Sequence, residues 1–233
     1  MRFAIYESER VEAVPGAKGK CPGCDAQLIA KCGTKKIWHW AHKGQRHCDH
    51  WWENETQWHR DWKNNFPSDW QEIAARDESG ELHIADVKTP KGLVVEFQHS
   101  YIKPKEARIR TDFHQPMFWI VDGTRRKTDR KQFKAAVSDG VKHRTKDGLV
   151  QQLWVNDSRL LKEWVHVAVI VAFDFGHETV WLLRRIKDDW VYGFEYPKSK
   201  LVEHIAESTP IPDVLFGEPR RQSVRYRRRR ARF

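Results

Sequence analysis

Two acidic residues and a glutamine lie on neighbouring predicted strands near the middle of the chain. Asp86 ends one strand, and Glu96 and Gln98 lie within the next, an apolar run at 93–98. Residues two positions apart share a face of a strand, and a hairpin would bring Asp86 alongside them. A glutamate inside an apolar strand is costly unless it is paired or binds a cation. Converging carboxylates are the ligands that Mg²⁺ prefers, and such a site activates water for phosphodiester cleavage.

A second polar group precedes these strands. Glu55, His59 and Lys63 are spaced i, i+4, i+8, so they form one stripe of a helix predicted over 51–66 and ended by Pro67. The stripe offers a carboxylate, an imidazole and an ammonium group to a site. A solvated helix face has the same spacing, so the spacing alone does not decide between the two.

The cysteines point to a different metal. All four lie in one segment: Cys21, Cys24, Cys32 and Cys48. The C-x-x-C knuckle supplies two thiolates, and a tetrahedral Zn²⁺ site needs a second pair from His39, His42, Cys48 or Cys32. On an extended strand His39 and His42 point to opposite faces, so one of them is expected to bind. The preferred set is Cys21, Cys24, His42 and Cys48, with His39 as the alternate.

Two short strands at 27–31 and 35–40, around a turn at Gly33, would complete a small zinc ribbon. The metal would stabilise a segment too short to have its own core. The alternative is a set of free, buried cysteines in a reducing compartment. A disulfide-rich secreted domain is disfavoured because the start of the chain lacks a signal peptide. No apolar run reaches the length of a membrane span, and a cytoplasmic location is expected.

The elements around these residues predict an α/β (α+β) fold. A helix is followed by strands at 71–75, 81–87 and 93–98, a helix at 100–111 and a strand at 117–123. This order predicts a restriction-endonuclease-like mixed sheet flanked by helices. Beyond a polar linker, 124–148, with a surface helix at 131–137, strands are expected at 165–175, 179–185 and 190–195, and a helix at 198–206. These elements form either a small β-rich C-terminal module or an extension of the same sheet.

The chain is therefore divided into a zinc-ribbon-like region (1–50), a nuclease-like core (51–140), a β-rich module (141–218) and an Arg-rich tail (219–233). The formal net charge is +10, and the eight arginines of the tail account for all but +2 of it. Such a tail suits a polyanion, because basic side chains release counterions from DNA. The candidate DNA-binding residues are Arg220, Arg221, Arg225, Arg227, Arg228, Arg229, Arg230 and Arg232.

The motifs, taken together, resemble the competence protein CoiA family, whose nuclease core belongs to the PD-(D/E)xK superfamily. The resemblance covers residues 1–125. It rests on the knuckle Cys21–Cys24, the H-W-A-H segment at 39–42, the following Cys48, the N-E-T-x-x-H-x-x-x-K signature at 54–63, Ala85–Val87 and the E-x-Q-x-S segment at 96–100. Several motifs in the correct order are more specific than any one of them.

The resemblance implies a metal-dependent DNA nuclease in which Asp86 and Glu96 bind catalytic Mg²⁺ or Mn²⁺, with Glu55 as a third carboxylate. Gln98 occupies the place of the superfamily's lysine. An amide is neither a base nor a cation, although it can orient water. Lys63 or His59 would then supply the missing charge or proton transfer. The family's link to competence implies single-stranded or branched DNA, with recombination or single-strand-binding proteins as further partners.

Three functions compete at this point. The first is a Mg²⁺-dependent endonuclease. The second is a catalytically weak or inactive DNA-binding recombination accessory protein, which the glutamine at position 98 favours. The third is a zinc-stabilised protein-interaction module whose sheet is only a scaffold.

Overall fold

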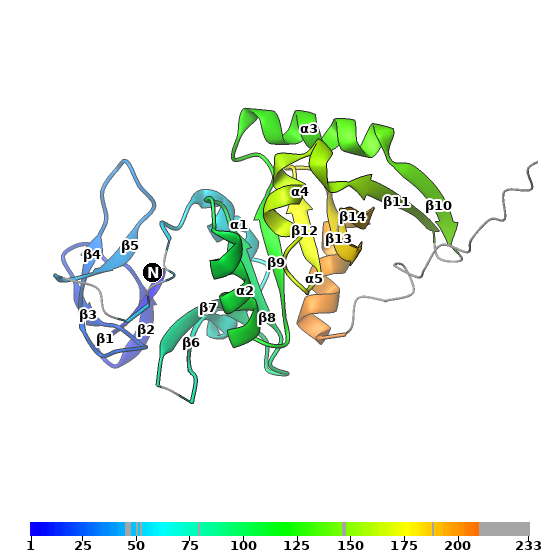
Figure 1. The fold of residues 1–233 in the computed structure, drawn as a ribbon. Helices are drawn as coiled ribbons and strands as arrows, with labels where there is room; N and C mark the ends of the chain where they lie inside the picture. The colour runs from blue at the N-terminus through cyan, green and yellow to red at the C-terminus, as the bar shows by residue number, and fades with distance from the viewer. Residues whose placement is uncertain are drawn as a thin grey trace, which may run out of the picture.

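Two β-sheets organise this chain, as seen in a computed structural model that describes residues 1–44, 48–49, 51, 53–78, 80–145, 148–187 and 189–209. The smaller sheet is N-terminal, and the larger one spans the rest of the described chain (Figure 1). Within the described residues, no helix is both long and apolar enough to cross a membrane.

The N-terminal sheet is antiparallel, in the spatial order β2-β1-β3-β4-β5. Its strands are β1 (Phe3–Tyr6), β2 (Glu9–Glu12), β3 (Lys18–Lys20), β4 (Gln27–Lys31) and β5 (His39–His42). Leu28 and Trp40 are fully buried and form the centre of a small core. The predicted ribbon hairpin is present as β4 and β5, although the second strand begins later than expected.

The large sheet is mixed, in the spatial order β10-β11-β14-β13-β12-β9-β8-β7-β6. Its strands are β6 (Gln71–Arg76), β7 (Leu82–Lys88), β8 (Val94–Gln98), β9 (Met117–Asp122), β10 (Val141–Thr145), β11 (Gly148–Trp154), β12 (Val171–Asp174), β13 (Thr179–Lys187) and β14 (Trp190–Pro197). The central strands β8, β9 and β12 are parallel, and the other neighbours are antiparallel. The strands after residue 140 thus extend the same sheet.

Helices cover both faces of this sheet. They are α1 (Gln57–Lys63), α2 (Pro104–Phe113), α3 (Lys127–Asp139), α4 (Arg159–Trp164) and α5 (Lys198–Glu207), with short 3₁₀ turns η1 (Ser68–Trp70) and η2 (Val155–Asp157). One apolar layer joins the sheet to α2, α3 and α4, and the other joins it to α1 and α5. The predicted mixed sheet flanked by helices is confirmed.

Three predicted elements differ from the structure. The helix expected over 51–66 begins only at Gln57, because a capping box starts it: the Thr56 N–H donates to Nδ1 of His59 at 3.2 Å. Glu55 therefore lies on extended chain before the helix and not on a helical stripe. Within 165–175 only β12 is a strand, and the end of the expected linker forms β10 at the edge of the sheet.

Candidate metal centre and acidic pocket

Four predicted zinc ligands converge beside the N-terminal sheet. One ligand atom from each of Cys21, Cys24, His42 and Cys48 lies within 4.8 Å of all the others. Sγ of Cys21 is 3.8 Å from Sγ of Cys48, and Sγ of Cys24 is 3.4 Å from Nε2 of His42. This is the set preferred from the sequence. The alternate His39 lies apart from it, with Nδ1 bonded to the carbonyl of Ile37.

The knuckle and the hairpin explain this convergence. The Cys21 N–H donates to the Ala26 carbonyl, and the Asp25 N–H donates back to the Cys21 carbonyl. These two hydrogen bonds close a tight turn, and both thiol groups of the knuckle lie on the same side of it. His42 ends β5, where it pairs with Leu28 of β4, and the alternation of strand side chains separates it from His39.

The geometry fits Zn²⁺. In a tetrahedron with Zn–S bonds of about 2.3 Å, two sulfur atoms lie about 3.8 Å apart. The contact between the thiol groups of Cys21 and Cys48 lowers the pKa of Cys21 to about 5 and raises that of Cys48. Neighbouring thiols oppose one another's ionisation, and a divalent cation would allow all of them to bind as thiolates. The described part of the chain contains no second group of three such ligand atoms.

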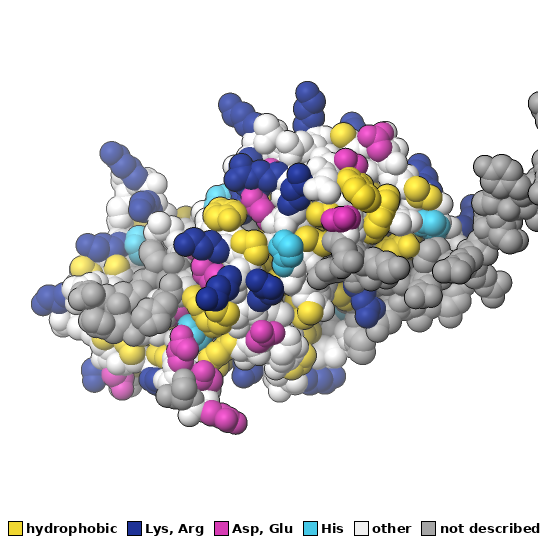
Figure 2. Space-filling model, in the orientation of Figure 1, with side chains coloured by type: hydrophobic (Ala, Val, Ile, Leu, Met, Phe, Trp, Pro, Cys, Tyr) yellow, Lys and Arg dark blue, Asp and Glu magenta, His cyan; other side chains and the backbone are white. Residues whose placement is uncertain are grey.

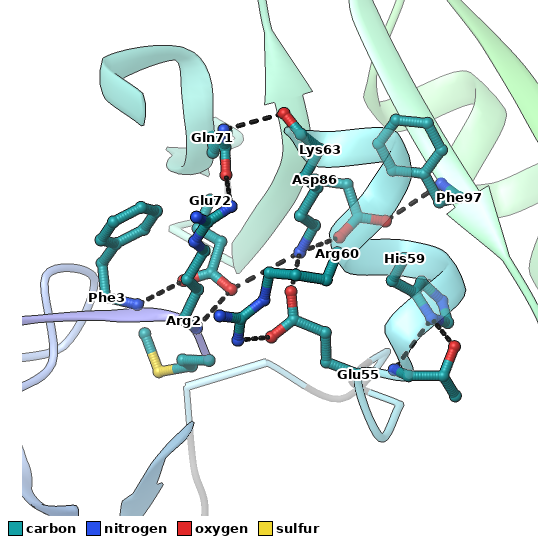
Figure 3. Close-up of polar contacts among 12 residues, drawn as sticks. Arg2, Phe3, Glu55, His59, Arg60, Lys63, Gln71, Glu72, Asp86 and Phe97 are labelled. Atoms are coloured by element: carbon teal, nitrogen blue, oxygen red, sulfur yellow. Dashed lines mark hydrogen bonds and ion pairs between the residues drawn. The ribbon is translucent and has the colours of Figure 1, made fainter. Parts of the chain in front are cut away.

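A buried lysine is the centre of a second cluster (Figure 3). Nζ of Lys63 lies 2.8 Å from Asp86, 3.4 Å from Glu55 and 3.5 Å from Glu72. Burial lowers the pKa of Lys63, but the three carboxylates outweigh it and the net pKa is raised. Burial likewise opposes the charge of Glu55, yet Lys63 and Arg60 lower its pKa to about 2. The cluster is therefore charged at neutral pH.

Glu96 lies beside Asp86, as the sequence predicts. The Asp86 N–H donates to Oε1 of Glu96 at 3.2 Å, and the Phe97 N–H donates to Oδ2 of Asp86 at 3.0 Å. Burial and the neighbouring charge of Asp86 raise the pKa of Glu96 well above its ordinary value. Its nearest ring nitrogen, on His114, is 3.9 Å away, and burial lowers the pKa of that imidazole to about 4. A like charge beside a buried carboxyl group raises its pKa, and a divalent cation bound by both groups would offset that repulsion.

Gln98 and His59 both contact a carboxylate that the sequence analysis missed. Glu53 accepts bonds from Nε2 of Gln98 at 3.0 Å and from Nε2 of His59 at 2.8 Å, and it also accepts from the hydroxyl of Ser100. Burial opposes its charge, but His59 and the other donors lower the pKa of Glu53 to about 2. The Gln98 amide is thus used to hold the segment that carries Glu53, and both ring nitrogens of His59 are engaged.

One cavity joins the two clusters. Its lining includes His42 and Cys48 of the zinc set together with Lys63, Asp86 and Glu96. The candidate zinc site therefore forms a wall of the acidic pocket.

Hydrogen bonds hold the chain after Cys48 in place beside this cavity. Oδ1 of Asp49 accepts the Trp51 N–H at 2.9 Å and lies 3.2 Å from Nδ1 of His83 on β7. Arg110 of α2 donates to the Trp51 carbonyl at 2.5 Å. Glu53 and Glu55 follow directly in the chain. These contacts hold the described residues between Cys48 and Glu53 against β7 and α2.

Glu72 also escaped sequence analysis. Its carboxylate accepts the N–H groups of Arg2 and Phe3, at 2.7 and 3.1 Å, and so joins the N-terminal sheet to Lys63. The sequence gives little indication that Glu72 belongs to the site, because the strand around it has an ordinary composition. Glu53 had a signal: it lies two positions from Glu55, which places both on one side of an extended segment. The eight arginines of the tail lie outside the described residues.

Residues 7–50 match the family model for the competence protein CoiA, N-terminal domain. This match supports the CoiA-like family. It covers all four residues of the candidate zinc set and confirms the resemblance to the CoiA family for this N-terminal segment; the motifs at 54–63, 85–87 and 96–100 lie outside it. No curated protein and no solved structure matches the chain. Glu53, Glu55, Glu72, Asp86 and Glu96 of the acidic pocket lie beyond the matched segment, although His42, Cys48 and Asp49 within it also line the cavity.

Proposed function

We propose that this CoiA-like protein is a metal-dependent DNA endonuclease that cleaves phosphodiester bonds in single-stranded or branched DNA. The observation that carries the proposal is the meeting of Asp86, Glu96 and Lys63 in one cavity. The motif order resembles the PD-(D/E)xK nucleases, in which two carboxylates on adjacent strands act together with a lysine.

Asp86 and Glu96 fit a hard divalent cation, because they offer oxygen ligands from adjacent strands and repel each other without one. Mg²⁺ is commonly held by one or two carboxylates, with water and substrate phosphate completing its shell. When bound, the cation would activate water and neutralise charge on the phosphate. Glu55, expected as a third ligand, pairs instead with Lys63 and Arg60.

Lys63 supplies the positive charge that the superfamily's lysine would provide at the position of Gln98. Its raised pKa keeps it protonated, so it serves as a fixed positive charge and not as a base. A preorganised charge in a buried site stabilises negative charge that develops on a phosphate. Glu55 and Glu72 hold the ammonium group in place. The lysine thus comes from α1, while Gln98 on β8 holds Glu53.

The second candidate is a DNA-binding accessory protein without cleavage. The observation that favours it is Gln98, whose amide is committed to Glu53 and Ser100. In this second candidate function the pocket has no catalytic role, and basic side chains on the surface bind the DNA. Lysine and arginine side chains do lie over the face of α2 and α3 that Figure 2 shows.

The test is cleavage of labelled single-stranded, duplex and branched DNA with Mg²⁺ or Mn²⁺, comparing the wild type with Glu96→Ala. The nuclease proposal expects cleavage that the variant loses while its DNA affinity persists. Binding that falls steeply with salt, without cleavage of any substrate, would favour the accessory protein. Glu203→Gln, on α5, is the control for the loss of one carboxylate elsewhere.

A further inference from the structure

Among the described residues of the acidic pocket, Lys63, His59 and His114 are poorly placed to protonate a leaving oxygen, and Glu96 is assigned to the metal. Lys63 is held by three carboxylates. Both ring nitrogens of His59 are bonded, Nδ1 to the Thr56 N–H and Nε2 to Glu53. His114 is buried, with its pKa lowered to about 4. A proton donor beside these residues would supply what they do not.

We propose that His99, held by Asp122, is the catalytic residue that protonates the leaving oxygen during DNA cleavage at this pocket. This inference rests on the nuclease function proposed above. Asp122 is the positioning residue of the pair.

Asp122 is built into the end of a central strand. It closes β9, whose side chains are buried throughout, and is itself 2% exposed. Oδ1 accepts the N–H and the hydroxyl of Thr124, both at 2.7 Å. Oδ2 accepts Nδ1–H of His99, also at 2.7 Å. A carboxylate only accepts hydrogen bonds, so this contact fixes the proton of His99 on Nδ1 and turns Nε2 outward.

His99 is accessible where His59 is not. Its side chain is 37% exposed, and Nε2 has no hydrogen-bond partner in the described part of the chain. The imidazole is close to the pocket: its ring centroid is 5.9 Å from that of His59, which lines the cavity. Its backbone N–H donates to Glu53 at 3.2 Å. The same carboxylate thus fixes His59, Gln98 and the chain that carries His99.

The topology supports this placement. His99 follows β8 directly, and Asp122 ends the adjacent parallel strand β9. The carboxyl ends of parallel strands meet at one edge of a sheet, where ligands bind in open α/β folds. The charged and titratable groups around His99 are Asp122, Glu53 and His59, with Arg125 bonded to the neighbouring Ser100 carbonyl.

The chemical step balances without another reactant. The oxygen of a water molecule bonds to phosphorus, and the ester P–O bond breaks with its electron pair on the leaving oxygen. Nε2–H of the His99 imidazolium gives its proton to that oxygen, which becomes a hydroxyl group. The proton that the attacking water releases returns to His99 through solvent. A positioned general acid contributes roughly 10²- to 10⁴-fold to a rate.

A substrate with sulfur in place of the leaving oxygen tests the role directly. A thiolate departs without protonation, so a general acid is needed for the oxygen substrate and not for the sulfur one. Single-turnover rates would be measured on both substrates for the wild type, His99→Gln and Asp122→Asn. His143→Gln is the matched control, because His143 also has a bonded ring nitrogen but lies on β10 at the far edge of the sheet. Thermal unfolding of each variant checks its fold.

We expect His99→Gln to lose about 10²-fold or more on the oxygen substrate and to keep the wild-type rate on the sulfur substrate. Asp122→Asn should show the same pattern with a smaller loss. Equal losses on both substrates, or no loss on either, would overturn the role of His99 while leaving the nuclease in place. Wild-type inactivity on every substrate would remove the nuclease proposal and this inference together.

Discussion

Replacing Lys63 with methionine isolates the charge at the centre of the acidic pocket. The side chain of Lys63 is 4% exposed and faces Asp86, Glu55 and Glu72. Methionine keeps much of the length and apolar stem of lysine and removes only the ammonium group. The three carboxylates would lose the cation that they share; the side chains of Glu55 and Glu72 are buried, and that of Asp86 is partly exposed.

Breaking a buried ion pair by removing one partner costs about 3–5 kcal/mol. Glu55 keeps its pair with Arg60, and Glu72 keeps two backbone N–H donors, so we expect the lower part of that range at pH 7. The pKa of Glu55 is lowered to about 2 from its ordinary 4.5, and that of Lys63 is raised from 10.5. The stability that the Glu55 carboxylate contributes to the folded state is present above pH 4.5 and is lost as the pH falls toward 2. The stability that protonated Lys63 contributes to the folded state is fully present below pH 10.5 and is lost progressively as the pH rises above that value.

Urea unfolding of the zinc-loaded protein at pH 7 and at pH 4 measures the effect. The loss in Lys63→Met should shrink at pH 4, because the variant's carboxylates take up protons. Lys198→Met is the matched control: Lys198 lies 2.8 Å from Asp174, but Asp174 keeps N–H donors from Trp58 and Trp62. The control should lose only about 1–2 kcal/mol. Equal losses in both variants, or a neutral Lys63→Met, would refute the reasoning.

Three further predictions concern the metals and the tail. Glu96→Gln removes the repulsion between Glu96 and Asp86, so in the absence of divalent cations its Tm should rise by about 2–4 °C for each kcal/mol of repulsion relieved. Because the pKa of Glu96 is raised, this gain in Tm should be present at pH 7 and vanish below pH 4.5. Differential scanning calorimetry measures the change. Chelating zinc should loosen residues 1–50, and unchanged protease resistance there would contradict the ribbon. Deleting residues 219–233 should weaken DNA binding and reduce its salt dependence without abolishing cleavage; equal affinity of the truncated protein at every salt concentration would contradict the role of the tail.

The convergence of the four candidate zinc ligands and the pairing of the two strand carboxylates could be predicted from the sequence because their spacing is short and local. Cys21 and Cys24 define their own turn, and strand alternation separates His42 from His39. Asp86 and Glu96 meet because a hairpin brings adjacent strands together. Each of these predictions needs only one or two elements.

The helix boundary was predicted wrongly because the aromatic pattern continues upstream of the true start. Trp51 fits the helical period, but the bond from Thr56 to His59 begins the helix only at Gln57. Glu55 therefore reaches Lys63 from extended chain and not from a helical turn. Local capping chemistry prevailed over hydrophobic periodicity.

Glu53 and Glu72 could not be placed because their partners are distant in the sequence. Glu72 contacts Arg2, and Glu53 contacts Gln98 and Ser100. Their roles depend on how two sheets meet, which no local pattern encodes. The C-terminal strands likewise gave no sign of which sheet they would join, since an edge hairpin and a separate module have the same alternation.

Binding of Mn²⁺ to the zinc-loaded protein, followed by electron paramagnetic resonance, tests the central claim that Asp86 and Glu96 form a catalytic-metal site. The wild type and Glu203→Gln should bind the ion, and Asp86→Asn and Glu96→Gln should lose it while their zinc content stays the same. Wild-type affinity in Glu96→Gln would contradict the claim, as would a wild type that binds no Mn²⁺.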